Sequence, residues 1–134
     1  MNEPYTRVTL NEWSRGSLFQ SYMDHMRIVM SLTVDIDVTE LIAFAKKNRL
    51  KFYPSMIWVV SKVVNAHDEF KYGWDGEGNL IKWDFISPSY TDFHKEDEGF
   101  TKYVTAYSDD LFDFCGRFAL DQEKNRNKRA FVGD

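Results

Sequence analysis

Between residues 54 and 107 the spacing of the apolar residues changes once, from that of a helix to that of a strand. This change constrains the fold more than any other feature. Pro54 fits the first turn of a helix, where its missing N–H is not needed, and the residues after it are apolar almost all round. Such a helix is expected to be deeply buried. From Phe70 onward the apolar residues recur with period two, as they do in strands. The chain is therefore predicted to combine helices with strands.

Two strand pairs are predicted after the change of period. FKYGW and NLIKWD flank DGEG, whose Asp75-Gly76 step and second glycine suit a hairpin turn. SYTDFH and FTKYVTAY flank KEDEG in the same manner. Short strands that are close in sequence usually pair antiparallel, so both pairs are expected to be hairpins.

The N-terminal third predicts two helices and a strand. Thr9 or Asn11 can cap a first helix that extends to about residue 26. Residues 28–37 alternate between apolar and polar side chains, which indicates a half-buried strand. Asp37 followed by Glu40 has the pattern of a capping box, ahead of an amphipathic helix over residues 38–45.

A last helix is expected to open at Ser108, with Asp109 and Asp110 in its first turn. After Leu120 the sequence becomes polar and is expected to fray. Residues 1–120 are therefore interpreted as one domain and residues 121–134 as a polar tail. The predicted fold class is α/β (α+β): a partial two-layer sandwich with a mixed, mostly antiparallel sheet and about four helices.

Composition excludes several classes of protein. A net charge of −4 offers no basic surface for nucleic acid, and no apolar run approaches the roughly 20 residues that span a bilayer. The N-terminus lacks the pattern of a signal peptide. Cys115 is the single cysteine, which fits a cytoplasmic protein with a buried, inert thiol. Aromatic residues make up 16% of the chain, and they either form a large core or line a pocket for an aromatic ligand.

The residues alone indicate no catalytic motif. His25, His67 and His94 lack the spacing of a metal site, and there is no P-loop or nucleophile elbow. Asp35 and Asp37 share a face of the predicted strand, but a polar outer face explains them better than a catalytic carboxylate pair. The DGEGN glycines are interpreted as a turn.

Several motifs together resemble one enzyme family. They are E-W-x-R at 12–15, S-L-T at 31–33, KFYP at 51–54, N-A-H-x-E-F at 65–70, L-I-x-W-D at 80–84 and Y-T-x-F-H at 90–94. In this order and spacing they resemble the chloramphenicol O-acetyltransferases from about Tyr5 to Leu120. The resemblance implies the fold of the coenzyme A-dependent acyltransferases, a trimer, and a pocket between neighbouring subunits.

The resemblance also implies a reaction. In the family a histidine of an H-H-x-x-x-D-G motif takes the proton of an acceptor hydroxyl, which attacks the thioester of acetyl-CoA, and a serine stabilises the oxyanion. Arg15 matches an arginine that pairs with the aspartate of that motif. Tyr22 and Phe100 match pocket aromatics, and Met30, Ser89 and Thr91 fall at or near pocket positions. Each of these residues could instead be an ordinary core or strand-face residue.

The sequence departs from the family at the catalytic motif. No two histidines are adjacent, and nothing matches H-x-x-x-D-G. His94 matches the family's Y-T-x-F-H, which does not supply the base. We therefore expect no catalytic residue in this chain, which resembles a truncated member that is inactive alone.

Two functions remain open at this point. One is acetyl transfer to chloramphenicol or a similar alcohol, with the missing half supplied in trans. The other is a non-catalytic module that binds a small ligand or a protein partner. Because a missing half would expose apolar surface, we expect homo-oligomers or pairing with a complementary chain.

Overall fold

The computed structural model describes residues 4–129 and 131–132. Its elements, in chain order, are β1 (Tyr5–Arg7), α1 (Gly16–Ser21), the π-helix η1 (Tyr22–Met26), α2 (Thr39–Lys47), α3 (Phe52–Ala66), the 3-10 helix η2 (Asp68–Phe70), β2 (Tyr72–Trp74), β3 (Leu80–Trp83), β4 (Ser89–His94), β5 (Gly99–Val104), α4 (Leu111–Asn125) and β6 (Phe131–Val132). The mixture of helices with mostly antiparallel strands confirms the predicted fold class.

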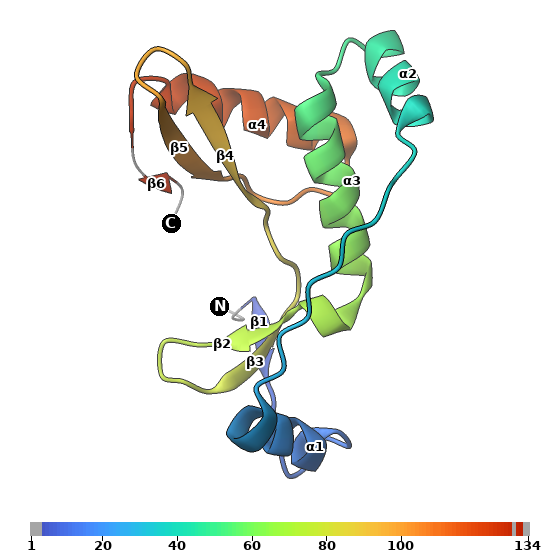
Figure 1. Cartoon of the computed structure of the whole chain (residues 1–134), viewed down its shortest axis with the longest axis vertical. Helices are drawn as coiled ribbons and strands as arrows, with labels where there is room; N and C mark the ends of the chain where they lie inside the picture. The colour runs from blue at the N-terminus through green and yellow to red at the C-terminus, as the bar shows by residue number, and fades with distance from the viewer. Residues whose placement is uncertain (1–3, 130, 133–134) are drawn as a thin grey trace.

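The strands form two separate three-stranded sheets. The first has the order β1-β3-β2 with antiparallel pairs, and the second has the order β4-β5-β6, in which β6 runs parallel to β5. Figure 1 shows the two sheets at different heights of the molecule, joined by the linker between β3 and β4, with α3 running beside this linker. Both predicted hairpins are present.

The DGEG sequence forms the first hairpin turn through one side chain. Asp75 Oδ1 accepts hydrogen bonds from the main-chain N–H groups of Glu77 and Asn79, at 2.9 and 2.8 Å. Gly78 has a φ of +83°, a conformation that glycine adopts at little cost. The hydrogen bonds from Asn79, followed by the one from Glu77, lower the pKa of Asp75. The turn is therefore closed by a charged carboxylate at neutral pH.

The core lies between α4 and the second sheet. Tyr90 of β4 is stacked against Phe118 of α4 and against Tyr103 of β5, with ring centroids 4.7 and 5.6 Å apart. Ile57 of α3 packs against this cluster. The Tyr90 hydroxyl lies 2.7 Å from Thr105 Oγ1, which donates to a carboxylate oxygen of Asp121 at 2.7 Å. The aromatic cluster thus ends in a hydrogen-bonded chain that returns to α4.

Helix α3 begins as predicted, with Pro54 buried in its first turn. It is less buried than its composition suggests, because Val60 and Val63 are about half exposed, at 48% and 53%. The prediction of a helix buried on all sides is therefore wrong for this face of α3.

The first helix starts later than predicted. Thr9 and Asn11 lie in a turn, where the Thr9 carbonyl accepts hydrogen bonds from Glu12 and Trp13, and α1 begins only at Gly16. A Cβ at Gly16 would lie 1.9 Å from the carbonyl oxygen of Leu10. The chain doubles back too tightly at this point to continue a helix from residue 11.

The last helix differs from the prediction at both ends. Its N-cap is Asp110, not Ser108, and its side chain accepts the N–H of Asp113 at 2.7 Å. Its last residue is Asn125, so the prediction that the chain frays after Leu120 is wrong. Asn125 is itself buried, and its amide donates to the Asp121 carbonyl at 2.8 Å.

The predicted strand over residues 28–37 is not formed. This segment is extended and exposed, and it joins η1 to α2 without belonging to either sheet. The prediction of a half-buried strand is therefore wrong for the chain by itself. One half of the predicted capping box after this segment is present, because Asp37 Oδ1 accepts the main-chain N–H of Thr39 at 2.9 Å. The α2 helix follows, close to its predicted position.

Within the described part of the chain, none of the helices combines the length and apolar character that crossing a membrane would require.

We expect Phe118→Ala to lower the free energy of unfolding by about 3 to 5 kcal/mol, because it removes a buried ring that stacks on Tyr90. Phe112→Ala on the same helix is the matched control, because Phe112 is 52% exposed whereas Phe118 is 3% exposed. Urea unfolding followed by circular dichroism measures both. Equal losses in the two variants would contradict this description of the core.

Stability should fall at high pH because burial raises the pKa of Tyr90 to about 12. The phenol is protonated in the fold, so its contribution is complete below pH 10 and is lost as the pH rises from about 10 to about 12. The loss is roughly 2 to 3 kcal/mol for a shift of this size. Urea midpoints between pH 8 and pH 12 should show a shallower decline in Tyr90→Phe. An unchanged slope would contradict the assignment.

Candidate functional site

The second sheet has one buried face and one open face. Alternation along β4 and β5 turns Tyr90, Thr101 and Tyr103 into the core. The opposite face carries three cross-strand pairs, which are Ser89 with Val104, Thr91 with Lys102, and Phe93 with Phe100. We call these six residues the open face. It combines two aromatic rings, two hydroxyls and one cation on a short stretch of sheet.

The aromatic pair of the open face is exposed. Phe93 is 60% and Phe100 is 56% exposed, although the two are directly opposite each other in the ladder. Directly opposite side chains lie close enough to form one surface. Because water solvates these rings poorly, they favour contact with another apolar or aromatic group.

Tyr53 attaches the N-terminus of α3 to this strand. Its hydroxyl donates to the Thr91 carbonyl at 3.1 Å. Its ring meets Tyr90 and Phe118 edge to face, with centroids 6.2 and 6.1 Å apart. The KFYP motif, which contains Tyr53, therefore positions the strand that carries Thr91. Sequence reasoning used this motif only for recognition and did not include Tyr53 or Phe93 among the site residues.

The other predicted site residues lie elsewhere. Arg15 precedes α1, Tyr22 opens η1, and Met30 belongs to the extended segment. Figure 1 shows α1 at the opposite end of the long axis from β4 and β5. Within one chain, therefore, Ser89, Thr91 and Phe100 share one face, whereas Arg15 and Tyr22 are remote from it. Arg15 and Tyr22 are both exposed, and Met30 is 86% exposed.

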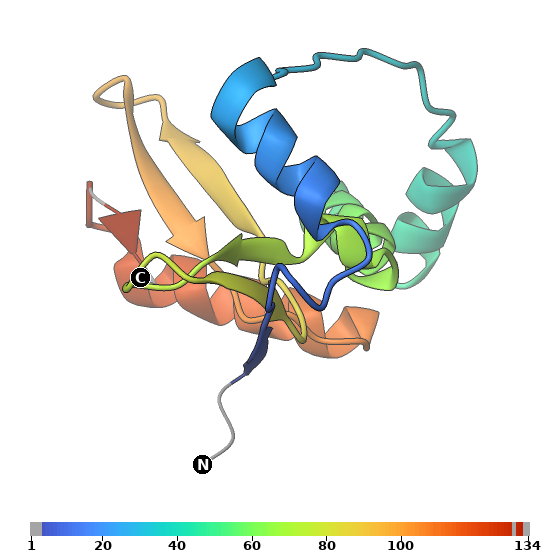
Figure 2. The ribbon, with the colours of Figure 1, turned by 90° about the horizontal axis from the view of Figure 1, so that it is seen from below.

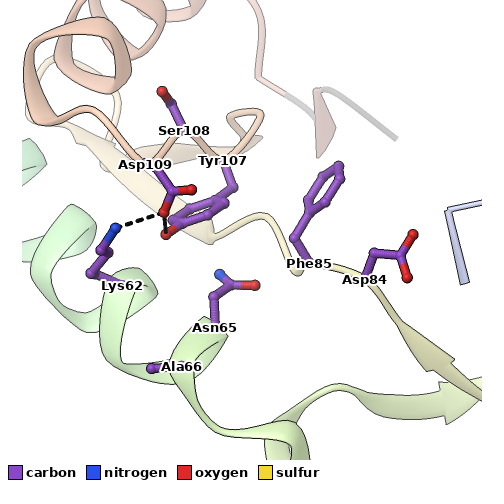
Figure 3. Close-up of a pocket in the computed structure, with 8 residues that line it drawn as sticks. All are labelled: Lys62, Asn65, Ala66, Asp84, Phe85, Tyr107, Ser108 and Asp109. Carbon is purple, nitrogen blue, oxygen red and sulfur yellow. Dashed lines mark hydrogen bonds and ion pairs between the residues drawn. The ribbon is translucent and has the colours of Figure 1, made fainter.

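A cleft of about 510 Å³ lies between α3, the β3–β4 linker and the segment before α4 (Figure 3). On one side of it Asp109 Oδ1 accepts hydrogen bonds from Lys62 Nζ and from the Tyr107 hydroxyl, both at 2.7 Å. The bonds from Lys62 and then Tyr107 lower the pKa of Asp109. Burial, followed by the bond to Asp109, raises the pKa of Tyr107 to about 12. These two groups keep their charge states near neutral pH, so the pair suits binding better than proton transfer.

Asn65 forms another wall of this cleft and fixes the linker. Its side-chain oxygen accepts the N–H of Ile86 at 2.7 Å, and its amide donates to the Ile86 carbonyl at 2.9 Å. The same amide also donates to the Ser61 carbonyl on α3. The N-A-H-x-E-F motif therefore holds the connection between the two sheets.

His94 has a structural contact. Its Nε2 lies 2.9 Å from Thr101 Oγ1, and the Thr101 hydroxyl donates to the Lys128 carbonyl at 2.6 Å. Because the threonine hydrogen is already used, Nε2 must be the donor of the first bond. His94 also borders a second cleft, of about 490 Å³, together with Lys51 and Asp92.

No group of His, Cys, Asp and Glu among residues 4–129 is arranged to hold a metal ion. Cys115 is partly buried, and burial raises the pKa of its thiol, so it is protonated at neutral pH.

Comparison with known proteins identifies the family. The family model for chloramphenicol acetyltransferase matches residues 1–134. A chloramphenicol acetyltransferase of Clostridium butyricum is 37% identical over 121 residues, covering 90% of this chain and 55% of that protein. Chloramphenicol acetyltransferase 2 of Escherichia coli is 36% identical over 128 residues, covering 95% of this chain and 60% of that protein.

A solved chloramphenicol acetyltransferase structure has the same fold, with a TM-score of 0.79 at 17% identity over 96% of this chain and 67% of that one. The α/β architecture is thus the fold of that solved structure. The chain belongs to the chloramphenicol acetyltransferase family, as its motifs predicted. It spans about half the length of the curated relatives it matches.

Asn65→Ala should lower the free energy of unfolding by about 1 to 3 kcal/mol, because it leaves both main-chain polar groups of Ile86 without their partner. Asn48→Ala is the matched control, since the Asn48 amide makes one bond, to a carbonyl of its own helix. Urea unfolding measures both variants. A loss at Asn65 no larger than the loss at Asn48 would contradict the role of Asn65 as a clamp.

Proposed function

We propose that this chain supplies the acceptor-binding side of a site that transfers an acetyl group from acetyl-CoA to a hydroxyl of chloramphenicol. The observation that carries the proposal is the exposed pair Phe93 and Phe100 beside the hydroxyls of Ser89 and Thr91. This face occurs in a chain whose relatives are named chloramphenicol acetyltransferases. Aromatic rings and hydroxyls together suit an aromatic alcohol.

The reaction requires a base that this chain does not offer at the open face. The acceptor oxygen forms a bond to the thioester carbon as its proton passes to the base, and coenzyme A leaves as the thiolate and is then protonated. His94 Nε2 already donates to Thr101. The base in our proposal is therefore the histidine of an H-H-x-x-x-D-G segment, which the 134 residues do not contain. In this proposal these 134 residues do not carry out the transfer by themselves.

The separation of the proposed pocket residues supports a site built between chains. Arg15 and Tyr22 lie at the far end of the molecule from Phe100 (Figure 1). The Arg15 side chain has no ion pair or hydrogen bond within the described residues, which suits an acidic partner on another segment. We propose that Tyr22 and Met30 of one chain and Phe100 of a neighbouring chain line the same pocket in an oligomer, a trimer as in the family.

A non-catalytic binding module is the second candidate. It is favoured by the cleft beside Asn65, where the charge states of Asp109 and Tyr107 suit binding at neutral pH. In that case the ligand binds and leaves unchanged.

We also propose a cytoplasmic location, which the single cysteine supports.

A thiol-release assay with acetyl-CoA and chloramphenicol tests the proposal. We expect no release above background from the chain alone, and release when it is co-expressed with a polypeptide that carries the H-H-x-x-x-D-G half of a relative. Activity of the chain alone that disappears in His94→Ala would overturn the proposal. Binding of chloramphenicol without release in either sample would favour the second candidate.

Phe100→Ala should weaken chloramphenicol binding about tenfold, which corresponds to about 1.4 kcal/mol, because it removes half of the exposed aromatic pair. Isothermal titration calorimetry measures the dissociation constant. Phe112→Ala serves as the control, because Phe112 is similarly exposed, at 52%, but lies on α4. Equal affinity of the Phe100→Ala variant and the unmodified chain would show that the open face is not the acceptor site.

A further inference from the structure

The cleft between α3 and the β3–β4 linker has two aromatic walls that do not close on each other. Phe85 of the linker and Tyr107 of the segment before α4 have ring centroids 6.5 Å apart and an interplanar angle of 32°. Two tilted rings leave a wedge in which part of each face stays open, and Phe85 is 49% exposed. Figure 3 shows both side chains bordering the cleft of about 510 Å³. A third group can therefore contact both rings.

The cleft also offers a carboxylate without a partner. Asp84 lies at the side of the two rings that is remote from Asp109 (Figure 3). Its carboxylate makes no hydrogen bond or ion pair within the described part of the chain. It interacts at longer range with Lys82, which pairs instead with Asp68 at 2.9 Å. The negative charge of Asp84 is therefore left to attract a ligand.

We propose that this cleft binds a small organic cation of the aryl-alkylammonium class, with its ammonium group against the Phe85 and Tyr107 rings and close to Asp84. Aromatic faces attract a cation that lies over them, and the carboxylate adds a charge of the opposite sign. A neutral aromatic ligand gains the ring contacts only, and an anion is repelled by Asp84. The inference gives a ligand class to the cleft of the second candidate function, and it does not rest on acetyl transfer.

Lys62 does not make the cleft a site for anions. Its Nζ lies 2.7 Å from Asp109 Oδ1 and 5.9 Å from the centroid of the Trp58 ring. The hydrogen bonds from Lys62 and then Tyr107 lower the pKa of Asp109, so this carboxylate stays charged at neutral pH. An anion would have to displace a carboxylate that two donors already hold. The charge of Lys62 is thus neutralised within the chain.

The two walls are held in place before any ligand binds. Asn65 binds both main-chain polar groups of Ile86, the residue that follows Phe85. The main-chain N–H of Tyr107 donates to Ser87 Oγ at 3.0 Å, which joins the second wall to the same linker. A ligand therefore does not have to order the walls as it binds, and this pre-organisation favours affinity.

The proposed cation site is separate from the acceptor site proposed above. No residue that lines the cleft belongs to the open face. Met30 belongs to the segment between η1 and α2, which Figure 2 shows arching away from the rest of the molecule. Each site can therefore be tested without the other.

An NMR titration of backbone amides tests the site, with benzyltrimethylammonium as the probe. We expect saturable shifts at Phe85, Tyr107 and Ser108 with roughly millimolar affinity, as is usual for a ligand of this size. Benzyl alcohol should bind about tenfold more weakly because it lacks the charge. Sodium benzoate should leave these amides unshifted. Raising the salt concentration from about 50 to about 500 mM should weaken binding of the cation about threefold.

Two variants separate the contribution of the ring from that of the charge. Phe85→Leu should raise the dissociation constant of the probe about fivefold, because an aliphatic side chain has no π face. Asp84→Asn should raise it about threefold, because the charge is lost while the side chain keeps its size. Phe112→Leu on α4 and Glu96→Gln in the β4–β5 turn are the matched controls. Each changes an exposed residue of the same type outside the cleft and should leave the affinity unchanged.

Four outcomes would overturn the proposal. They are the absence of saturable shifts at these amides up to about 20 mM probe, equal affinity for benzyl alcohol and the cation, unchanged affinity in both Phe85→Leu and Asp84→Asn, or a loss of affinity in Phe100→Ala as large as in Phe85→Leu. The last result would place the probe on the open face. None of them changes the expected result of the thiol-release assay, so the two proposals can fail separately.

Discussion

The stacking of Tyr90 between Phe118 and Tyr103 is the interaction on which the rest of the described structure depends. It joins the second sheet to α4, and the Tyr53 ring that meets its edge joins both to α3. The Tyr90 hydroxyl is satisfied by a hydrogen-bonded chain through Thr105 to Asp121. The buried Tyr103 hydroxyl, in contrast, has no hydrogen-bond partner among the described residues. Because α4 covers one face of the second sheet, the side chains that alternate with the core residues along β4 and β5 lie on the opposite, solvent-exposed face.

The open face is consequently a product of the core. Thr91 and Phe93 point outward because Tyr90 and Asp92 fall between and beside them in the strand, and the hairpin register then sets Phe100 opposite Phe93. A one-residue slip would exchange the two faces and bury the hydroxyls. Three of the residues that the resemblance implied as pocket residues, Ser89, Thr91 and Phe100, lie on this face.

Local signals predicted most of the fold. The Asp75 turn, the Pro54 helix start and the period-two strands of the two hairpins are decided by residues close in sequence, and the structure has these elements. The start of α1 could not be predicted, because it depends on the backbone of Leu10 lying against Gly16. The extension of α4 to Asn125 was missed because polar residues were interpreted as a tail, although Asn125 packs against the molecule.

The segment 28–37 shows where sequence reasoning stops. The alternation of side chains predicts which face of a strand is apolar, but it does not predict which other strand pairs with it. Within the described chain, no strand pairs with segment 28–37. The site residues show the same limit. Motif matching implied that Tyr22 and Phe100 line a pocket between neighbouring subunits, and within one chain Arg15 and Tyr22 lie apart from Phe100. Tyr53 and Phe93 were left out, although the KFYP motif and the alternation of β4 could have indicated them.

The clamp at Asn65 has a mechanical consequence. One amide group binds both polar groups of a single linker residue and also a carbonyl of α3, so a change in the angle between the two sheets at this linker would have to break these hydrogen bonds. Force applied to either sheet is transmitted to α3 through this amide. A partner that shifted one sheet would therefore also shift the other sheet relative to α3.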